Sequence, residues 1–157
     1  MFEGKLESIF MASQAKEPMH DVDSAQAIAG KGLAGDRYGE LGGTFAKPKS
    51  PDREVTLIEA EAVEAASREY QLPLGCHETR RNLVTRGVPL NHLVGQEFFV
   101  GAVRLRGIRL CEPCQHLEEL TRPGVRKSLV HRGGLRAQVV EGGILKVGDN
   151  VRPVPGS

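Results

Sequence analysis

The sequence is poor in aromatic side chains and in cysteine, and it has no long apolar run. It holds no tryptophan, five phenylalanines and two tyrosines, too few rings for a stacking platform that would bind single-stranded nucleic acid. No apolar stretch approaches the roughly 18 residues of a membrane helix. Residues 1–10 also lack the apolar centre of a signal peptide. These absences predict a cytoplasmic protein that binds neither nucleic acid nor a membrane.

Neither positive nor negative charge is in excess. The net charge is +1, from 21 lysines and arginines against 20 aspartates and glutamates, which argues against a protein that binds by neutralising phosphates along nucleic acid. The exception is a basic stretch from Arg122 to Arg136 that contains no acidic residue. It is either a solvated face or a pocket for an anion, such as the phosphate of a small cofactor.

What the sequence has in abundance is turn residues. It contains 19 glycines and 9 prolines, which divide 157 residues into short segments typical of a β-rich fold. We expect one domain over residues 1–157, β-dominated and mixed, with a few short helices. Residues 30–51 are expected to form a long loop, residues 59–70 the clearest helix, and residues 115–120 and 124–130 short helices. Two hairpins are predicted, over residues 97–110 and 135–147, with a bulge at Gly107 in the first.

The most informative segment is the run of residues 110–114, Leu-Cys-Glu-Pro-Cys, at the end of a predicted strand. Pro113 prevents continued ladder pairing, so Cys114 is expected in a turn or loop. Arg109, His116 and the downstream basic stretch lie nearby in sequence and favour the thiolate, the form that acts as nucleophile and metal ligand. Cys114 is therefore the candidate catalytic and metal-binding residue.

Three other interpretations of the cysteines stay open at this point. Cys111 follows an apolar strand residue and is expected to be a buried side chain. Cys111 and Cys114 could form a thioredoxin-like redox pair, although the sequence shows no βαβ context. Together with Cys76 and His77 they could instead hold a structural zinc ion, although adjacent Cys-His has poor geometry for two ligands of one ion.

Several segments, in order along the chain, resemble the MOSC domain, the C-terminal domain of molybdenum-cofactor sulfurases, of the stand-alone bacterial type. Each is weak alone, and together they span residues 32–151. The matching segments are Gly-Leu-Ala-Gly-Asp-Arg-Tyr at 32–38, Arg-Glu-Val-Thr-Leu-Ile at 53–58, Arg-Arg-Asn-Leu-Val-Thr at 80–85, Gly-Gln-Glu-Phe-Phe-Val-Gly at 95–101, Pro-Cys at 113–114, Gly-Leu-Arg-Ala-Gln-Val-Val at 134–140, and Val-Gly-Asp at 147–149.

The resemblance implies a MOSC-type β-barrel and a single functional cysteine, which by position is Cys114. In relatives that reduce N-hydroxylated compounds, this cysteine is a ligand to the metal of the molybdenum cofactor (molybdopterin), and an Arg-x-Asn segment helps to hold the cofactor. Arg80 and Asn82 match that segment. A soft thiolate suits a transition metal, and a phosphate-bearing pterin needs arginine donors.

Further candidates come from the residues themselves. Arg132 and Arg136 in the basic stretch, with Arg80, are candidate donors to the cofactor, although Arg80 could instead pair with Glu78 on the surface. Asp36 lies in the Gly-Asp-Arg segment and is a candidate cofactor contact or an acceptor for loop N–H groups. His131, just before two glycines, is a candidate catalytic residue.

Three hypotheses about function follow. The first is a molybdenum-dependent oxidoreductase that acts on a small N-hydroxylated substrate, with Cys114 on the metal. The sequence has no iron–sulfur motif and no dinucleotide fingerprint, so this activity would need an external electron-transfer protein. The second is a sulfur carrier that accepts a persulfide on Cys114 from a pyridoxal-phosphate-dependent cysteine desulfurase. The third is a zinc-binding or ligand-free interaction module.

Overall fold

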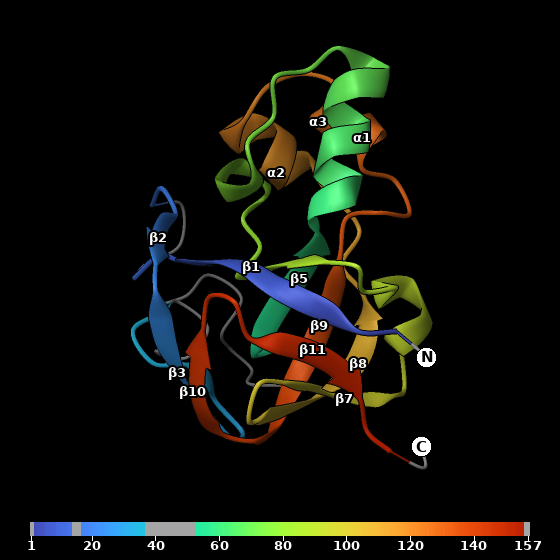
Figure 1. The fold of residues 1–157 in the computed structure, drawn as a ribbon. Coiled ribbons are helices and arrows are strands. Elements are labelled where there is room, and N and C mark those ends of the chain that lie inside the picture. The colour runs from blue at the N-terminus through green and yellow to red at the C-terminus, as the bar shows by residue number, and fades with distance from the viewer. Residues whose placement is uncertain (1, 14–16, 37–52, 156–157) are drawn as a thin grey trace.

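The structure is a computed structural model that describes residues 2–13, 17–36 and 53–155. A strand-built body lies at one end of the molecule and three helices gather at the other (Figure 1). No helix within the described ranges is long and apolar enough to cross a membrane. Arg37 and Tyr38, the last two residues of the Gly-Asp-Arg-Tyr segment, and most of the expected long loop lie outside the described residues.

The main sheet closes into a barrel. Its order is β11-β7-β8-β9-β5-β6-β1-β2, and β11 also pairs with β1, so seven strands form a ring and β2 extends beside β1. All neighbours are antiparallel except β5 and β6, which a helix connects, as parallel pairing requires. The strands are β1 (Gly4–Met11), β2 (His20–Val22), β5 (Val55–Glu59), β6 (Leu83–Arg86), β7 (Glu97–Val100), β8 (Val103–Leu110), β9 (Leu135–Glu141) and β11 (Asn150–Pro153).

A smaller sheet corrects one prediction. It has the order β10-β3-β4, from β10 (Gly143–Lys146), β3 (Ser24–Ile28) and β4 (Gly32–Leu33). The predicted hairpin over residues 135–147 is therefore wrong, because β10 pairs with β3 and not with β9. The reason is that β9 lies between β5 and β8, so both of its edges are already hydrogen-bonded. The hairpin of β7 and β8 is confirmed, and β8 has a register shift against β9 between Gly107 and Arg109, next to the predicted bulge.

Alternating side chains fill the barrel. Along β9 the buried positions are Leu135, Ala137 and Val139, each separated by a partly exposed residue, the period of a strand with one face inward. Phe98 from β7 is the largest fully buried side chain in this core. Burying a side chain of this size contributes about 2–3 kcal/mol. The β-dominated barrel with few short helices confirms the predicted fold class.

The helices cover one end of the barrel and enclose a second core. They are α1 (Ala60–Tyr70), α2 (Gln115–Leu120) and α3 (Val125–Ser128), with short 3-10 turns η2 (Cys76–Thr79) and η3 (Leu90–Leu93). Val63 and Ala66 of α1 pack with Leu117 of α2 and Val125 of α3. The predicted helix over residues 59–70 is confirmed, and it ends at Gln71 in a left-handed conformation. This second core fixes α2, whose first residue directly follows Cys114.

Candidate functional site

Cys114 lies where the chain leaves the barrel for the helical layer. β8 ends at Leu110, and residues 111–114 connect it to α2, with Cys114 as the exposed residue immediately before the helix. Cys111 is buried, with 2% of its surface exposed. The sequence placed Cys114 in a loop and Cys111 in the interior, and the structure agrees with both placements. Cys114 is therefore the thiol of this segment that can reach a ligand or a partner.

A second loop, residues 131–134, lies against the cysteine loop. The Cys111 N–H donates to the Gly134 carbonyl oxygen at 2.7 Å. A side chain at Gly133 would collide with the Cys111 carbonyl oxygen and with the ring of Pro113. The close approach of the two backbones explains why glycine occupies this position. The two loops together form what we call the cysteine-loop site, made of residues 111–114 and 131–134.

Glu112 and His131 connect these two loops at the surface. The Glu112 carboxylate accepts the His131 backbone N–H at 2.8 Å and lies 2.9 Å from the ring Nδ1. The Asn91 side chain donates to the His131 carbonyl oxygen at 2.7 Å. His131 has a φ of 63°, a conformation that costs a residue other than glycine about 1 kcal/mol. Three polar contacts hold this residue in place, and its ring stays 80% exposed beside the cysteine loop.

Arg81 joins the same loops from inside the protein. Its guanidinium donates to the Gly133 carbonyl oxygen at 2.7 Å, to the Cys111 carbonyl oxygen at 2.9 Å and to the Thr79 carbonyl oxygen at 3.2 Å. The residue is 8% exposed. Sequence reasoning selected its neighbour Arg80 and missed Arg81, because nothing in the sequence indicates which of two adjacent arginines faces inward.

Two of the predicted cofactor contacts are buried and have structural partners. Asn82 is fully buried; its Oδ1 accepts from the Thr56 N–H at 3.1 Å and its Nδ2 donates to the Phe10 carbonyl oxygen at 3.1 Å. Asp36 is fully buried too, and its Oδ1 accepts the Ala12 N–H at 3.2 Å. Asn82 thus ties β5 and β1 to the start of β6. A cofactor-binding role for either residue stays a prediction.

The three predicted arginine contacts lie in different places. Arg80 donates to the Glu17 carbonyl oxygen and lines a small pocket of about 170 Å³ with His77 and Leu120, at the end of α2 away from Cys114. Arg132 belongs to the cysteine-loop site; it donates to the Ser128 carbonyl oxygen at 2.8 Å and to Glu69 at 3.0 Å. Arg136 lies on β9, where it pairs with Thr56 and Arg109 in register. The structure brings the loop of Cys114 into contact with the loop of His131 and Arg132, through the backbones of Cys111 and Gly134 and the side chain of Glu112. Arg80 belongs to neither loop.

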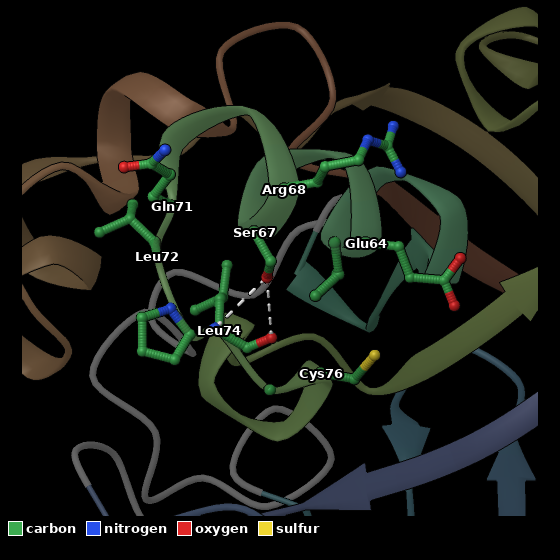
Figure 2. Close-up of a pocket in the computed structure, with 10 residues that line it drawn as sticks. Glu64, Ser67, Arg68, Gln71, Leu72, Leu74 and Cys76 are labelled. Atoms are coloured by element: carbon green, nitrogen blue, oxygen red, sulfur yellow. Dashed lines mark hydrogen bonds between the residues drawn. The ribbon is translucent and has the colours of Figure 1, made fainter.

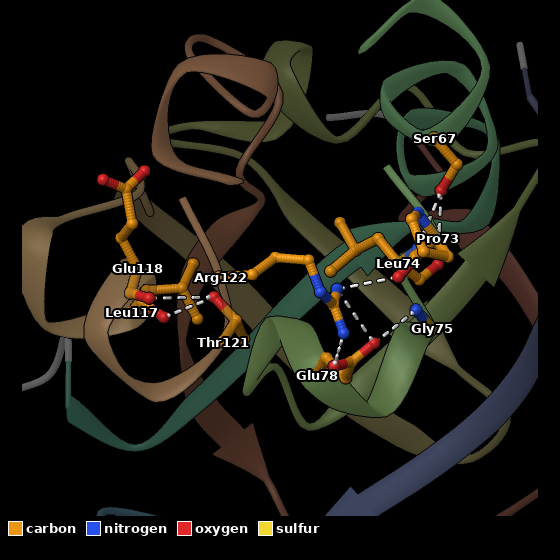
Figure 3. A network of polar contacts seen from close by, with 9 residues as sticks. All are labelled: Ser67, Pro73, Leu74, Gly75, Glu78, Leu117, Glu118, Thr121 and Arg122. Atoms are coloured by element: carbon orange, nitrogen blue, oxygen red, sulfur yellow. Dashed lines mark hydrogen bonds and ion pairs between the residues drawn. The ribbon is translucent and has the colours of Figure 1, made fainter. Parts of the chain in front are cut away.

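Arg122, the first residue of the basic stretch, takes part in a polar network rather than in an open anion pocket. Its guanidinium donates to Glu78 at 2.6 Å and to the Pro73 carbonyl oxygen at 2.7 Å, while Glu78 accepts the Gly75 N–H at 2.9 Å (Figure 3). Partial burial raises the pKa of Glu78, but the hydrogen bonds from Gly75 and Arg122 outweigh that effect and lower it overall. The network connects the chain before η2 to the chain after α2.

This lowered pKa predicts a pH dependence of stability. Because the folded pKa of Glu78 lies below its ordinary value near 4.5, the network stabilises the protein above that pH and loses this contribution as the pH falls through the folded pKa. We expect Glu78→Gln to reduce the free energy of unfolding by about 1 kcal/mol at pH 7, and the difference from the unmodified protein to disappear on acidification. Urea unfolding at several pH values measures this, with the exposed Glu119→Gln as control. A difference that persists at the lowest pH would contradict it.

The largest groove described lies elsewhere. It has a volume of about 670 Å³ and runs between α1 and residues 71–76, where the Ser67 hydroxyl bonds to the backbone of Leu74 (Figure 2). Cys76 lies at the end opposite Gln71, and burial together with Glu7 and Glu64 raises the pKa of its thiol. This thiol is therefore less nucleophilic than an ordinary cysteine at neutral pH. No residue of the cysteine-loop site lines the groove.

The described residues do not form a protein-only metal site. Across the described ranges, no three side chains of histidine, cysteine, aspartate or glutamate gather closely enough to hold a metal ion. The zinc site considered from Cys76, His77, Cys111 and Cys114 is thus not assembled in this structure.

Comparison with known proteins identifies the family. The profile of the MOSC domain matches residues 29–152, so the chain belongs to the MOSC domain family. The structure resembles the YuaD protein from Bacillus subtilis, with a TM-score of 0.78 and 18% identity over 96% of this chain and 97% of that chain.

Two further similar structures are YiiM proteins. YiiM from Geobacillus stearothermophilus has a TM-score of 0.74 and 13% identity over 96% of this chain and 75% of that chain. YiiM from Escherichia coli has a TM-score of 0.69 and 17% identity over 100% of this chain and 71% of that chain. The search of curated protein sequences gave no match. At these identities the similarity establishes the shared fold.

Proposed function

We propose that this MOSC-domain protein binds the molybdenum cofactor through Cys114 and reduces small N-hydroxylated compounds with electrons from an external electron-transfer protein. The observation that carries the proposal is the exposed Cys114 thiol in the cysteine-loop site of a chain of this family. A thiolate is the ligand type that a soft transition metal prefers.

The residues around Cys114 fit such a cofactor in chemistry. One exposed thiol supplies a single protein ligand, which leaves the other positions to the cofactor. Arg132 lies on the adjacent loop and Arg136 on the strand that follows it. Both are candidates to contact an anionic tail, for which Arg132 would exchange its contact with Glu69. When bound, the cofactor would supply two-electron reduction chemistry.

The protein's own contribution is orientation and proton supply. Reduction of an N-hydroxyl group consumes two electrons and two protons and releases water. The Glu112 carboxylate fixes the Nδ1 side of His131, which leaves Nε2 on the exposed edge of the ring to hand a proton to the departing hydroxyl oxygen. Glu112 thereby orients His131 as the carboxylate of a catalytic dyad does.

The activity is tested with a chemical electron donor. Protein purified from a host that makes the cofactor is mixed with reduced methyl viologen and an amidoxime, and viologen oxidation is followed. We expect turnover by the unmodified protein and by Cys76→Ala, and at least a hundredfold loss in Cys114→Ala with an unchanged melting temperature. Equal turnover by Cys114→Ala would refute the role of this thiol.

The exposure of Cys114 also supports a second candidate function, that of a sulfur carrier. No pocket described in the structure has Cys114 in its lining, a position that suits transfer to a partner protein. As a sulfur carrier, the Cys114 thiolate would attack the outer sulfur of a persulfide on a pyridoxal-phosphate-dependent cysteine desulfurase. The desulfurase cysteine would leave as a thiolate. Mass spectrometry after incubation with a desulfurase and cysteine would show one added sulfur on Cys114 if this is the function.

A further inference from the structure

Arg81 is a buried cation whose partners are neutral. Its three hydrogen bonds go to backbone carbonyl oxygens, of Thr79, Cys111 and Gly133. Within the described ranges, no aspartate or glutamate pairs with it. Arg122 and Arg132, by contrast, are each paired with a glutamate. A buried charge is normally paired, so this unbalanced guanidinium needs an explanation.

The location of Arg81 supplies that explanation. Two of its carbonyl partners belong to the two halves of the cysteine-loop site, so the guanidinium fixes the loop of Cys114 against the loop of His131. Cys114 follows the bonded Cys111 by three residues, a span of at most about 11 Å. That span joins the two backbones, and the guanidinium itself is hydrogen-bonded to the Cys111 carbonyl oxygen. At a separation on the order of 10 Å, one unit charge changes the local concentration of an anion by about two- to fourfold at low salt.

We propose that Arg81 is the positioning residue of this site: its guanidinium holds the two loops together, and its unbalanced positive charge favours an anionic group at the Cys114 thiol. The proposal rests on the proposed function, in which Cys114 is the reactive thiol, and it defines the ligand class as anionic. An anionic pterin cofactor and a persulfide both belong to that class.

The test compares two alkylating reagents of similar size at the same thiol. Iodoacetate is an anion and iodoacetamide is neutral, so the ratio of their rate constants at Cys114 reports the local potential and is independent of the thiolate fraction. All proteins in this test carry the additional substitution Cys76→Ser, which removes the second accessible thiol. Cys111 is buried, and mass spectrometry identifies the cysteine that was alkylated. Arg81→Met removes the charge, Arg81→Lys retains it, and Arg68→Met on the exposed face of α1 is the control for net charge.

We expect Arg81→Met to lower the iodoacetate-to-iodoacetamide ratio about two- to fourfold at low salt, and Arg81→Lys and Arg68→Met to leave it unchanged. A merely structural role would change both rates together and leave the ratio constant. A ratio in Arg81→Met equal to that in Arg68→Met would overturn the proposal.

A second measurement needs no variant at Arg81. In the Cys76→Ser protein, added salt should reduce the rate with iodoacetate and leave the rate with iodoacetamide unchanged, because salt screens the attraction of the anion. An iodoacetate rate that rises or stays constant with salt would overturn the proposal even if Arg81→Met does not fold. Neither measurement depends on bound cofactor, so failure of the proposed function would leave this test intact.

Discussion

Replacing Gly134 with alanine is expected to destabilise the protein by about 2–5 kcal/mol. Gly134 has a φ of 114°, in the region that side chains avoid, and a Cβ there would overlap the Leu57 carbonyl oxygen. The backbone conformation costs about 1–2 kcal/mol, and relief of the overlap requires movement of β5 or β9, which adds about 1–3 kcal/mol. The same movement would disturb the neighbouring Gly133 that Arg81 binds. Urea denaturation measures the loss.

Gly95→Ala is the matched control for that variant. Gly95 also has a positive φ, 78°, but no atom lies within 4 Å of the position that a Cβ would take. Its alanine variant should therefore lose only about 1 kcal/mol, from the backbone conformation alone. Equal losses in the two variants would show that the approach of Gly134 to Leu57 is not as close as the structure has it.

Replacing Asn82 with alanine is expected to destabilise the protein by about 3–4 kcal/mol. The change leaves the Thr56 N–H and the Phe10 carbonyl oxygen without side-chain partners in a fully buried position, and each such orphaned group costs about 1–3 kcal/mol. The exposed Asn150→Ala should change the free energy of unfolding by less than about 0.5 kcal/mol.

The Asn82 variant also separates two roles. If Asn82 serves the cofactor, as the resemblance implied, cofactor content should fall while stability stays close to that of the unmodified protein. If it serves the fold, stability falls first, and any loss of cofactor should follow the unfolded fraction. Unfolding curves and pterin content measured on the same preparation decide between these outcomes.

Local patterns were sufficient to predict much of the fold. The helix of residues 59–70, the hairpin of β7 and β8 and the loop position of Cys114 each depend on residues close in sequence. The pairing of β10 with β3 could not be predicted in this way. It depends on β9 being occupied on both edges by strands far away in the chain.

In the site, too, residues that depend on local sequence could be predicted, and residues that depend on distant contacts could not. Cys114 was predictable because Pro113 and the end of a strand precede it. Glu112 and Arg81 were missed because their importance comes from contacts with residues 131 and 133, across long separations in sequence. A clue to Glu112 was present in its position between two cysteines. Nothing local distinguishes Arg81 from Arg80, since which arginine faces inward is set by the register of the chain entering β6.

The measurement that tests the central claim most directly is the molybdenum and pterin content of protein purified from a host that makes the cofactor. Near-stoichiometric molybdenum with fluorescent pterin oxidation products should be found in the unmodified protein and in Cys76→Ala, and both should be lost in a folded Cys114→Ala. Absence of both from the unmodified protein, or their full retention in Cys114→Ala, would contradict the claim that Cys114 binds the metal of this cofactor.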